Sequence, residues 1–336
     1  MAIITPLSRK QVQLFLLDYP RLGQLVDLQP TEHGIENTNY FVSLQRQGHK
    51  PARYVLTLFE QLTALQWPFY NQLLQTLAAH GLPVPAPMPS QQDAIYTSVN
   101  HKPMLLFPRF TGKHPGHVNT QHCEEIGLFL GHMHGITSTL NIHKQNSSNL
   151  DWMHKCHTQL RHHLSAIDLQ LLESEIAVYH AARTKFGALP AGIIHADLFR
   201  DNALFEGNTL TGVIDFYNAC SAPLLYDLAV VANDWCRLAP KTVPTAAPKK
   251  APLESATFEF SPQLTTSLLK AYSQQRSITE IEKQAWPLMC RFAACRFWLS
   301  RLLSHYFAEP GKPSKDPAEF RRILLERIET PARFVE

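Results

Sequence analysis

The spacing of apolar residues changes near Pro108, and this change constrains the fold of the 336-residue chain more than any other feature. Before Pro108, short runs rich in aromatic and β-branched residues predict strands at 40–44, 54–59, 94–97 and 104–107. Two stretches with apolar residues three and four apart predict helices at 9–19 and 64–80, the second ended by Gly81. A small antiparallel sheet with one inserted helix is therefore expected in the first part of the chain.

After Pro108 the pattern is mainly helical, interrupted by a β-rich stretch at 192–216. Helical spacing of apolar residues predicts helices at 123–140, 151–166, 169–186, 226–238, 263–275, 279–307 and 317–328. The segment 240–262 is rich in Ala, Pro and Lys, so we expect it to be a flexible surface loop. The predicted fold class is α+β, with a small antiparallel β-rich N-terminal lobe at 1–107 and a larger, mainly helical C-terminal lobe at 108–336.

Composition excludes several classes of protein. Hydrophobic residues make up 45% of the chain and charged residues 18%, which excludes a disordered chain. The net charge of +3 is too balanced for a dedicated nucleic-acid surface, and no apolar run is long enough to cross a membrane. The N-terminus lacks the order of a signal peptide, and the six Cys are read as reduced small hydrophobes. We expect a cytoplasmic protein whose partners include neither nucleic acid nor membrane; the oligomeric state stays open.

The stretch 193–216 carries the residues most relevant to chemistry, and its pattern predicts strand, polar loop, strand, turn and strand. This order carries Asp197, Asn202 and Asp215 toward the mouth of one crevice. Phosphoryl transfer needs a carboxylate that orients and deprotonates the acceptor hydroxyl, and oxygen ligands for Mg²⁺ at the phosphates. The three side chains supply these groups; in the alternative interpretation, Asp197 is only a polar residue in a loop.

The same residues resemble a known motif. His195, Asp197 and Asn202 match the kinase catalytic loop, H-x-D-x-x-x-x-N, and Asp215 stands where a second strand carries the magnesium-binding Asp. Phe216 is followed by Tyr217 instead of Gly, and the histidine–alanine–aspartate start resembles the aminoglycoside-phosphotransferase branch. Further stretches resemble one subgroup, the homoserine kinases built on that fold, at 34–42, 54–60, 214–220, 226–229 and 233–236.

The resemblance implies a two-lobed protein-kinase-like fold with the active site between the lobes. It also implies transfer of the γ-phosphate of ATP to the side-chain hydroxyl of L-homoserine, a step of threonine biosynthesis. Under this assignment Asp197 is the general base and His195 braces the loop by hydrogen bonding. Asn202 and Asp215 would hold Mg²⁺.

The resemblance also assigns nucleotide contacts. Gly34, Asn37 and Asn39 would lie in the turn over the phosphates, and Val55 and Phe107 would line the adenine slot beside a hinge at 106–110 that includes Arg109. Many kinases have a Lys or Arg in the third strand that grips the phosphates, but Thr57 occupies that position here. The candidates to replace this cation are Arg53, Lys102, Lys113 and Arg200.

Anchors for the amino-acid acceptor are sought near the metal loop and in the helix at 279–307. Asn218 and Arg200 are candidates near the loop, and Arg296 is preferred over Arg291 and Arg301 because aromatic residues flank it. Alternatively, these helical arginines only extend from a buried helix to the surface. Asp227 is expected to cap or tie the helix after the metal loop.

Two alternatives to a homoserine kinase remain. The same fold and reaction serve other alcohol acceptors, namely choline, ethanolamine, methylthioribose or an aminoglycoside. A nucleotide-binding pseudokinase is the alternative from another class, and the missing strand lysine at Thr57 is its only support.

Overall fold

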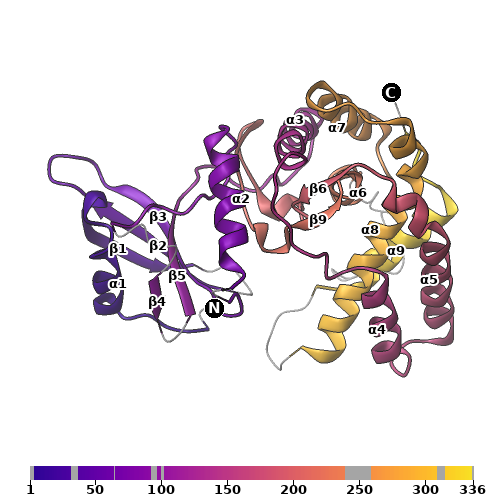
Figure 1. Cartoon of the computed structure of the whole chain (residues 1–336), viewed down its shortest axis with the longest axis horizontal. Coiled ribbons are helices and arrows are strands. Elements are labelled where there is room, and N and C mark those ends of the chain that lie inside the picture. The colour runs from indigo at the N-terminus through magenta and orange to yellow at the C-terminus, as the bar shows by residue number, and fades with distance from the viewer. Residues whose placement is uncertain are drawn as a thin grey trace, which may run out of the picture. The chain divides into compact units, whose positions relative to one another are not determined.

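The computed structural model describes residues 4–31, 37–63, 65–91, 97–99, 102–238, 259–308 and 315–334 (Figure 1). The chain forms two compact units. The first comprises Met1–Lys113, Leu204–Glu206 and Thr211–Tyr217, and the second comprises His114–Ala203, Gly207–Leu210 and Asn218–Glu336. The predicted loop at 240–262 falls mostly outside the described residues, as does most of the strand predicted at 94–97.

The first unit contains a five-stranded sheet in the order β1-β2-β3-β5-β4, and each neighbouring pair is antiparallel. Its strands are β1 (Gln24–Pro30), β2 (Thr38–Gln45), β3 (Ala52–Leu58), β4 (Thr97–Val99) and β5 (Lys102–Pro108). Burial alternates along β2, and its buried side chains Tyr40, Val42 and Leu44 share a core with helix α1 (Arg9–Leu16). One face of the sheet is therefore covered, which leaves the other face for different contacts.

Helix α2 (Trp67–Ala79) follows β3 and buries the face that contains Trp67, Tyr70, Leu73, Leu74 and Leu77. It ends at His80, and the following Gly81 has a φ of +83°, so the predicted glycine stop is confirmed. The ring of Trp67 lies 5.5 Å from that of Phe59, at the end of β3. Aromatic packing thus fixes α2 to the end of the third strand.

The second unit is mainly helical. Its helices are α3 (Thr120–Thr137), α4 (Leu150–Leu160), α5 (Ala166–Gly187), α6 (Leu225–Asp234), α7 (Pro262–Gln275), α8 (Glu280–Phe307) and α9 (Pro317–Glu329). Strand β6 (Ala191–Ile194) pairs antiparallel with β9 (Cys220–Pro223). Strand β7 (Ala203–Glu206) pairs with β8 (Thr209–Val213), and most of this pair belongs to the first unit. The helix predicted at 151–166 is wrong in extent, because α4 ends at Leu160 and the Ser165 side chain caps the start of α5.

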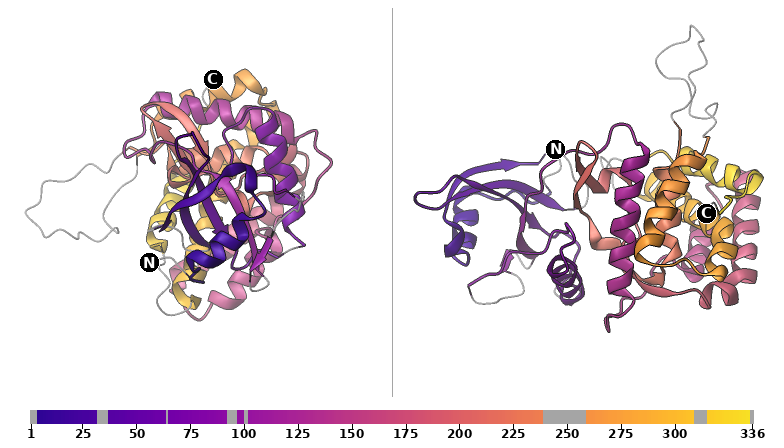
Figure 2. Two further views of the ribbon diagram at one scale, coloured as in Figure 1. Left: turned by 90° about the vertical axis from the view of Figure 1, so that its left-hand side faces the viewer. Right: turned by 90° about the horizontal axis from the view of Figure 1, so that it is seen from above.

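Helices α3 and α7 lie side by side (Figures 1 and 2). A Cβ atom on Gly127 would lie 2.4 Å from the Leu268 carbonyl oxygen, and one on Gly131 would lie 2.7 Å from the Tyr272 carbonyl oxygen. The two glycines, four residues apart on one face of α3, therefore permit an approach of the two backbones that any larger residue would prevent.

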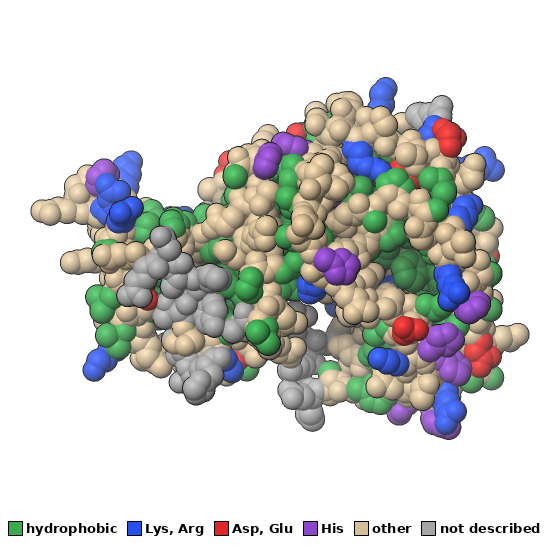
Figure 3. Space-filling model, in the orientation of Figure 1, with side chains coloured by type: hydrophobic (Ala, Val, Ile, Leu, Met, Phe, Trp, Pro, Cys, Tyr) green, Lys and Arg blue, Asp and Glu red, His purple; other side chains and the backbone are tan. Residues whose placement is uncertain are grey.

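The surface shows no strong segregation of charge in the view of Figure 3, where basic and acidic side chains are scattered over the visible face. This agrees with the net charge of +3. Among the described helices, none combines the length and the apolar character that crossing a lipid bilayer requires.

Candidate active site

The loop between β6 and β7 contains the predicted catalytic residues, and a buried carboxylate of α6 holds its start. Asp227 accepts the backbone N–H of His195 at Oδ2 and that of Ala196 at Oδ1, each at 2.7 Å. Ala196 has a φ of +66°, a left-handed conformation that is unfavourable for a residue with a side chain. Asp227 thus ties the loop, whereas the sequence suggested that it would cap or tie its own helix.

Asp197 follows directly, and several contacts surround it. Its backbone N–H donates to His195 Nδ1 at 3.3 Å, so His195 accepts at that nitrogen and braces the loop from inside. Its Oδ2 accepts from Asn218 Nδ2 at 3.2 Å. Its carbonyl oxygen accepts from Asn202 Nδ2 at 2.8 Å. The structure therefore brings Asp197, Asn202 and Asn218 together in one hydrogen-bonded cluster.

The orientation of the Asn202 amide is defined by that last hydrogen bond. Because Nδ2 donates to the Asp197 carbonyl, the amide oxygen is the atom left for a cation, and no described residue donates to it. An amide oxygen and a carboxylate are the hard ligands that Mg²⁺ prefers. Asn202 and Asp215 each carry a side chain of one of these two types.

Asp215 belongs to the first unit, where it follows β8. With a φ of +65° it is, besides Ala196, the other non-glycine residue with a positive φ in the described chain. The next residues fix its place: the Tyr217 carbonyl accepts the Tyr70 hydroxyl at 2.6 Å, and the Tyr217 ring lies 5.0 Å from Phe59. Such backbone strain is concentrated at functional sites in proteins. Of the two strained residues, Ala196 directly precedes the predicted base Asp197, and Asp215 is itself a predicted magnesium ligand.

Burial raises the pKa of Tyr217 well above its ordinary value, and the negative charge of Asp215 raises it further. The two side chains thus lie close enough to interact electrostatically. Tyr217 stands where the kinase motif has glycine, and the structure gives the tyrosine a packing role against Phe59 and Tyr70.

Four of the residues predicted to contact the nucleotide, Asn39, Val55, Thr57 and Phe107, share one face of the five-stranded sheet. Strand register pairs Asn39 with Thr57, Phe41 with Val55, and Val55 with Phe107. Residues directly opposite each other in antiparallel strands point to the same face. This face lies opposite the α1 core, while Gly34 lies outside the described residues.

Thr57 is buried and its hydroxyl donates to Asn39 Oδ1 at 2.7 Å. Nearby, the Glu60 backbone N–H donates to Asn37 Oδ1 at 3.3 Å. The three predicted contacts Asn37, Asn39 and Thr57 therefore belong to one hydrogen-bonded corner of the sheet. The corner holds polar neutral groups where many kinases place a cation.

Two of the four candidate replacement cations are paired with carboxylates. Lys102 donates to Glu60, which lowers the pKa of that carboxyl even though burial by itself would raise it. Arg200 donates to Asp234 through Nε at 3.2 Å and Nη2 at 3.1 Å. Their positive charges are therefore already matched.

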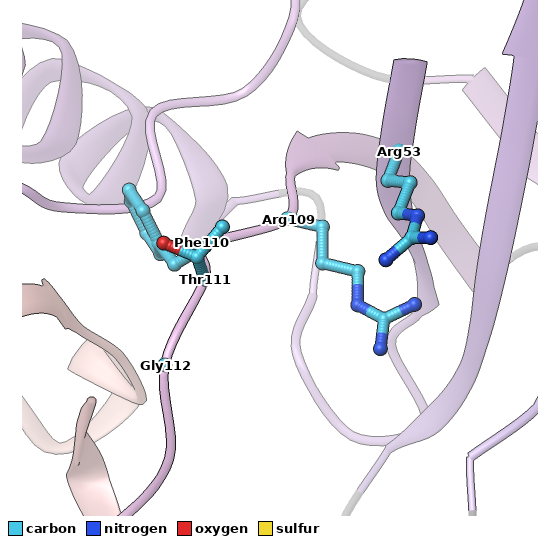
Figure 4. Close-up of a pocket in the computed structure, with 5 residues that line it drawn as sticks. All are labelled: Arg53, Arg109, Phe110, Thr111 and Gly112. Atoms are coloured by element: carbon cyan, nitrogen blue, oxygen red, sulfur yellow. The ribbon is translucent and has the colours of Figure 1, made fainter. Parts of the chain in front are cut away.

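Arg53, another candidate, lies with Arg109 beside a cavity of about 220 Å³ that Phe110, Thr111 and Gly112 also line (Figure 4). Figure 4 shows the two guanidinium groups next to each other. The Arg109 guanidinium lies 3.6 Å from the ring centroid of Phe41, on the face of the predicted nucleotide contacts. Partial burial and the charge of Arg53 lower the pKa of Arg109. This is a cationic surface to which no described carboxylate is bonded.

The three arginines of α8 differ in their partners. Arg291 forms an ion pair with the fully buried Glu175, and Arg301 with Glu319. Arg296 lies over the Phe297 ring at 4.3 Å and makes no ion pair in the described part of the chain. The arginine preferred from the sequence is thus the one whose charge stays available to a ligand.

Some residues around the site escaped sequence reasoning. Tyr226 has a buried hydroxyl to which no described residue is hydrogen-bonded. Burial raises the pKa of this hydroxyl, the nearby Arg296 opposes the rise, and the Asp197 carboxylate adds to it. Asp234, which binds Arg200, was also missed; a carboxylate inside an apolar helix was the signal that could have found it.

Comparisons with known proteins place the chain in a family. Residues 27–247 match the model of the phosphotransferase enzyme family. Among solved structures, the amicoumacin kinase in complex with AMP-PNP, Ca²⁺ and Ami has a TM-score of 0.66 and 17% identity, covering 96% of this chain and 97% of that one. The GDP complex of aminoglycoside 2′-phosphotransferase-IIIa has a TM-score of 0.61 and 14% identity, with 96% and 98% covered. The fold is thus that of the kinase-like phosphotransferases, with an antiparallel sheet lobe and a helical lobe, as predicted.

Relatives that match over nearly their full length indicate which kind of phosphotransferase the chain is similar to. The chain is 38% identical over 328 residues to the homoserine kinase of Pseudomonas aeruginosa strain UCBPP-PA14, covering 97% of this chain and 96% of that protein. It is 37% identical over 330 residues to the homoserine kinase of Methylobacillus flagellatus, with 98% and 96% covered. The chain therefore belongs to the phosphotransferase enzyme family, and these full-length relatives are homoserine kinases.

Proposed function

We propose that the chain is a homoserine kinase, which transfers the γ-phosphate of ATP to the side-chain hydroxyl of L-homoserine and forms O-phospho-L-homoserine. The observation that carries this proposal is the identity of 38% to a homoserine kinase over 97% of the chain. Homoserine phosphorylation serves threonine biosynthesis. The six cysteines are buried and free of disulfides, which suits a reducing compartment, and we place the enzyme in the cytoplasm.

Asp197 is the proposed general base. Its carboxylate would accept a hydrogen bond from the substrate hydroxyl and take the proton as the phosphoryl group arrives. Asn218 donates to one of its oxygens, which orients the carboxylate, and His195 accepts the Asp197 backbone N–H. The base is thus held from both its side chain and its backbone.

Asn202 and Asp215 are the proposed magnesium ligands. The hydrogen bond from Asn202 Nδ2 to the Asp197 carbonyl supports this role, since it directs the amide oxygen away from the backbone. When bound, Mg²⁺ would supply positive charge to neutralise the negative charge that develops on the phosphates during transfer. The same hydrogen bond links the metal ligand to the base, so the two functions share one loop.

The nucleotide is proposed to bind on the face of the sheet opposite the α1 core. Val55 and Phe107 would form the apolar slot for adenine, and Arg109 follows at the hinge, next to Phe41. The phosphates would lie toward the other end of β3, over the corner that contains Asn37, Asn39 and Thr57. Gly34, outside the described residues, is a further proposed phosphate contact.

The acceptor carboxylate is proposed to bind Arg296, which makes no ion pair with a described carboxylate and lies near the unsatisfied Tyr226 hydroxyl. Asn218 would orient the amino acid beside Asp197. Arg200, also a predicted substrate contact, has its charge matched by Asp234, so we assign it to holding the loop against α6.

The test is a substrate panel with ADP release as the readout. L-homoserine is expected to be the preferred acceptor over choline, ethanolamine, methylthioribose and an aminoglycoside. Good turnover of one of those alcohols with none of L-homoserine would replace the acceptor while keeping the fold. Nucleotide binding without turnover of any alcohol would support the pseudokinase alternative.

A further inference from the structure

A chain of buried hydrogen bonds runs from Asp227 into the helical unit. His134 of α3 lies between Asp227 and Tyr272 of α7: its Nε2 is 3.1 Å from Asp227 Oδ2 and its Nδ1 is 2.9 Å from the Tyr272 hydroxyl. The side chains of His134 and Asp227 have no exposed area, and Tyr272 is also buried. Beyond Tyr272, the series of hydrogen bonds continues through the side chains of Arg276 and Glu282.

The chemistry of each group determines the direction of every bond in this chain. Asp227 already accepts two backbone N–H groups, and a carboxylate only accepts, so His134 Nε2 must carry a hydrogen and donate. At the other end, Arg276 can only donate, so the Tyr272 oxygen accepts from Arg276 Nη1 at 3.0 Å. The remaining hydrogen of Tyr272 then points to His134 Nδ1, which accepts it in the neutral ring.

The charged form of the ring fits this arrangement less well. With hydrogens on both nitrogens, His134 would donate to Tyr272, and the tyrosine hydrogen would have no acceptor among the described residues. The Arg276 end is itself anchored, since Glu282 binds both terminal nitrogens of Arg276 at 3.0 and 3.1 Å. Glu282 is fixed in turn at the start of α8, where its side chain and that of Thr279 form a capping box.

We propose that His134 and Tyr272 are positioning residues for Asp197, the proposed base. They act through the orientation of the Asp227 carboxylate, which holds the start of the loop that contains Asp197. Both Asp227 oxygens must face the loop to hold the two backbone N–H groups, and the bond from His134 to Oδ2 opposes rotation away from them. The left-handed Ala196 depends on one of those bonds, and Asp197 follows it directly. The effect on catalysis rests on the proposed role of Asp197, whereas the effect on the loop does not.

The first experiment therefore measures the loop itself. In the full-length protein, Tyr272→Phe is expected to speed hydrogen exchange of the His195 and Ala196 amides about two- to tenfold, the range that one lost hydrogen bond covers. Tyr179→Phe is the matched control, because its buried hydroxyl has no hydrogen-bond partner among the described residues. Unchanged exchange in Tyr272→Phe, or an equal change in Tyr179→Phe, would overturn the proposal.

The second experiment measures catalysis and uses two substitutions of His134. His134→Gln keeps an amide nitrogen that can donate to Asp227, whereas His134→Leu removes the donor. The rate is divided by the concentration of protein that binds nucleotide, so that misfolded protein is not counted. On this basis kcat is expected to fall roughly 10- to 100-fold in His134→Leu, because the alignment of the base is lost. KM for both substrates is expected to stay within about twofold. The glutamine variant is expected to recover most of this loss. Equal loss in the two variants would contradict the proposal.

The outcomes separate the two proposals. If the loop amides respond as expected while the wild-type protein fails to phosphorylate L-homoserine, the positioning role stands and the proposed function fails. If His134→Leu does not fold, the exchange measurement on Tyr272→Phe decides the question by itself.

Discussion

The carboxylate of Asp227 holds Ala196 in a left-handed conformation, with its Oδ1 2.7 Å from the Ala196 backbone nitrogen. A residue of a helix thus determines the backbone of a loop that precedes it by about thirty positions in the chain. Left-handed backbone costs a non-glycine residue roughly 1–3 kcal/mol, so it persists only where surrounding contacts over-determine it. The Asp227 hydrogen bonds are those contacts.

Replacing Asp227 with Asn is expected to destabilise the protein by about 2 kcal/mol. The new amide group keeps one acceptor but turns an NH₂ toward a backbone N–H or toward His134, which leaves a buried donor without a partner. Urea unfolding measures the loss. A midpoint equal to that of the wild-type protein would contradict the role of Asp227 in holding the loop.

Asp197→Asn is expected to lower turnover by about 10²–10⁴, since the amide is no proton acceptor. Binding of ADP, measured by titration, should stay within about twofold, because Asp197 is assigned to the acceptor. Asp201→Asn is the matched control: Asp201 lies in the same loop, but its carboxylate is exposed and pairs with Lys315. Similar turnover in the two variants would argue against Asp197 as the base.

Arg296→Met is expected to raise KM for L-homoserine roughly 10- to 100-fold, the effect of one charged hydrogen-bonded contact to the carboxylate. KM for ATP should change little. Arg183→Met serves as a control, because Arg183 is an exposed arginine of α5. Steady-state kinetics at saturating ATP provide the measurement, and an unchanged KM for L-homoserine would exclude Arg296 as the anchor.

Arg109→Ala is expected to weaken ADP binding about two- to fivefold, the range for an exposed cation near an anion. The reason is the position of its guanidinium over Phe41, on the proposed nucleotide face. KM for L-homoserine should stay unchanged. Calorimetric titration with ADP tests this, and an effect on the acceptor alone would move Arg109 out of the nucleotide site.

Glu319 makes stability depend on pH. Burial alone would raise its pKa, but Arg237 and Arg301 outweigh burial, so the pKa of Glu319 lies below its ordinary value of 4.5. A group with a lowered pKa in the folded state stabilises the protein above pH 4.5, and this contribution is lost as pH falls through the folded value. Glu319→Gln should therefore show a smaller drop in unfolding free energy between pH 7 and acid than the wild-type protein. Parallel urea curves at several pH values make the comparison.

Most strands and helices could be predicted because one face of each is buried. In β2 every second side chain is buried, and in α2 the buried side chains lie on one face of the helix, so the sequence repeats with the period of each element. Strand β1 escaped prediction because none of its residues is buried, so its sequence lacks the alternation of a half-buried strand. Strand β9 escaped because Cys220–Pro223 is short and built of small residues.

The local part of the site was equally predictable. His195, Asp197 and Asn202 lie within eight residues, and their mutual hydrogen bonds need only the loop itself. The sequence also offered Asn218 and Arg296 as candidate contacts for the acceptor, and Asp227 as a tie for its helix, but it did not predict the partners of these residues. Which of the three arginines in α8 has no ion pair with a described residue depends on Glu175 and Glu319, carboxylates that come from other helices.

The sequence by itself determined the catalytic-loop motif and, for most elements, whether they are helices or strands. Both depend on the order and spacing of residues within a few positions of one another. Only the tertiary structure decided that hydrogen bonds connect Arg276, through the buried Tyr272 and His134, to Asp227. The physical reason is that a buried polar group needs a partner, and the identity of that partner is set by which helices pack together. Here the glycines of α3 let that helix approach α7 closely enough for His134 to meet Tyr272.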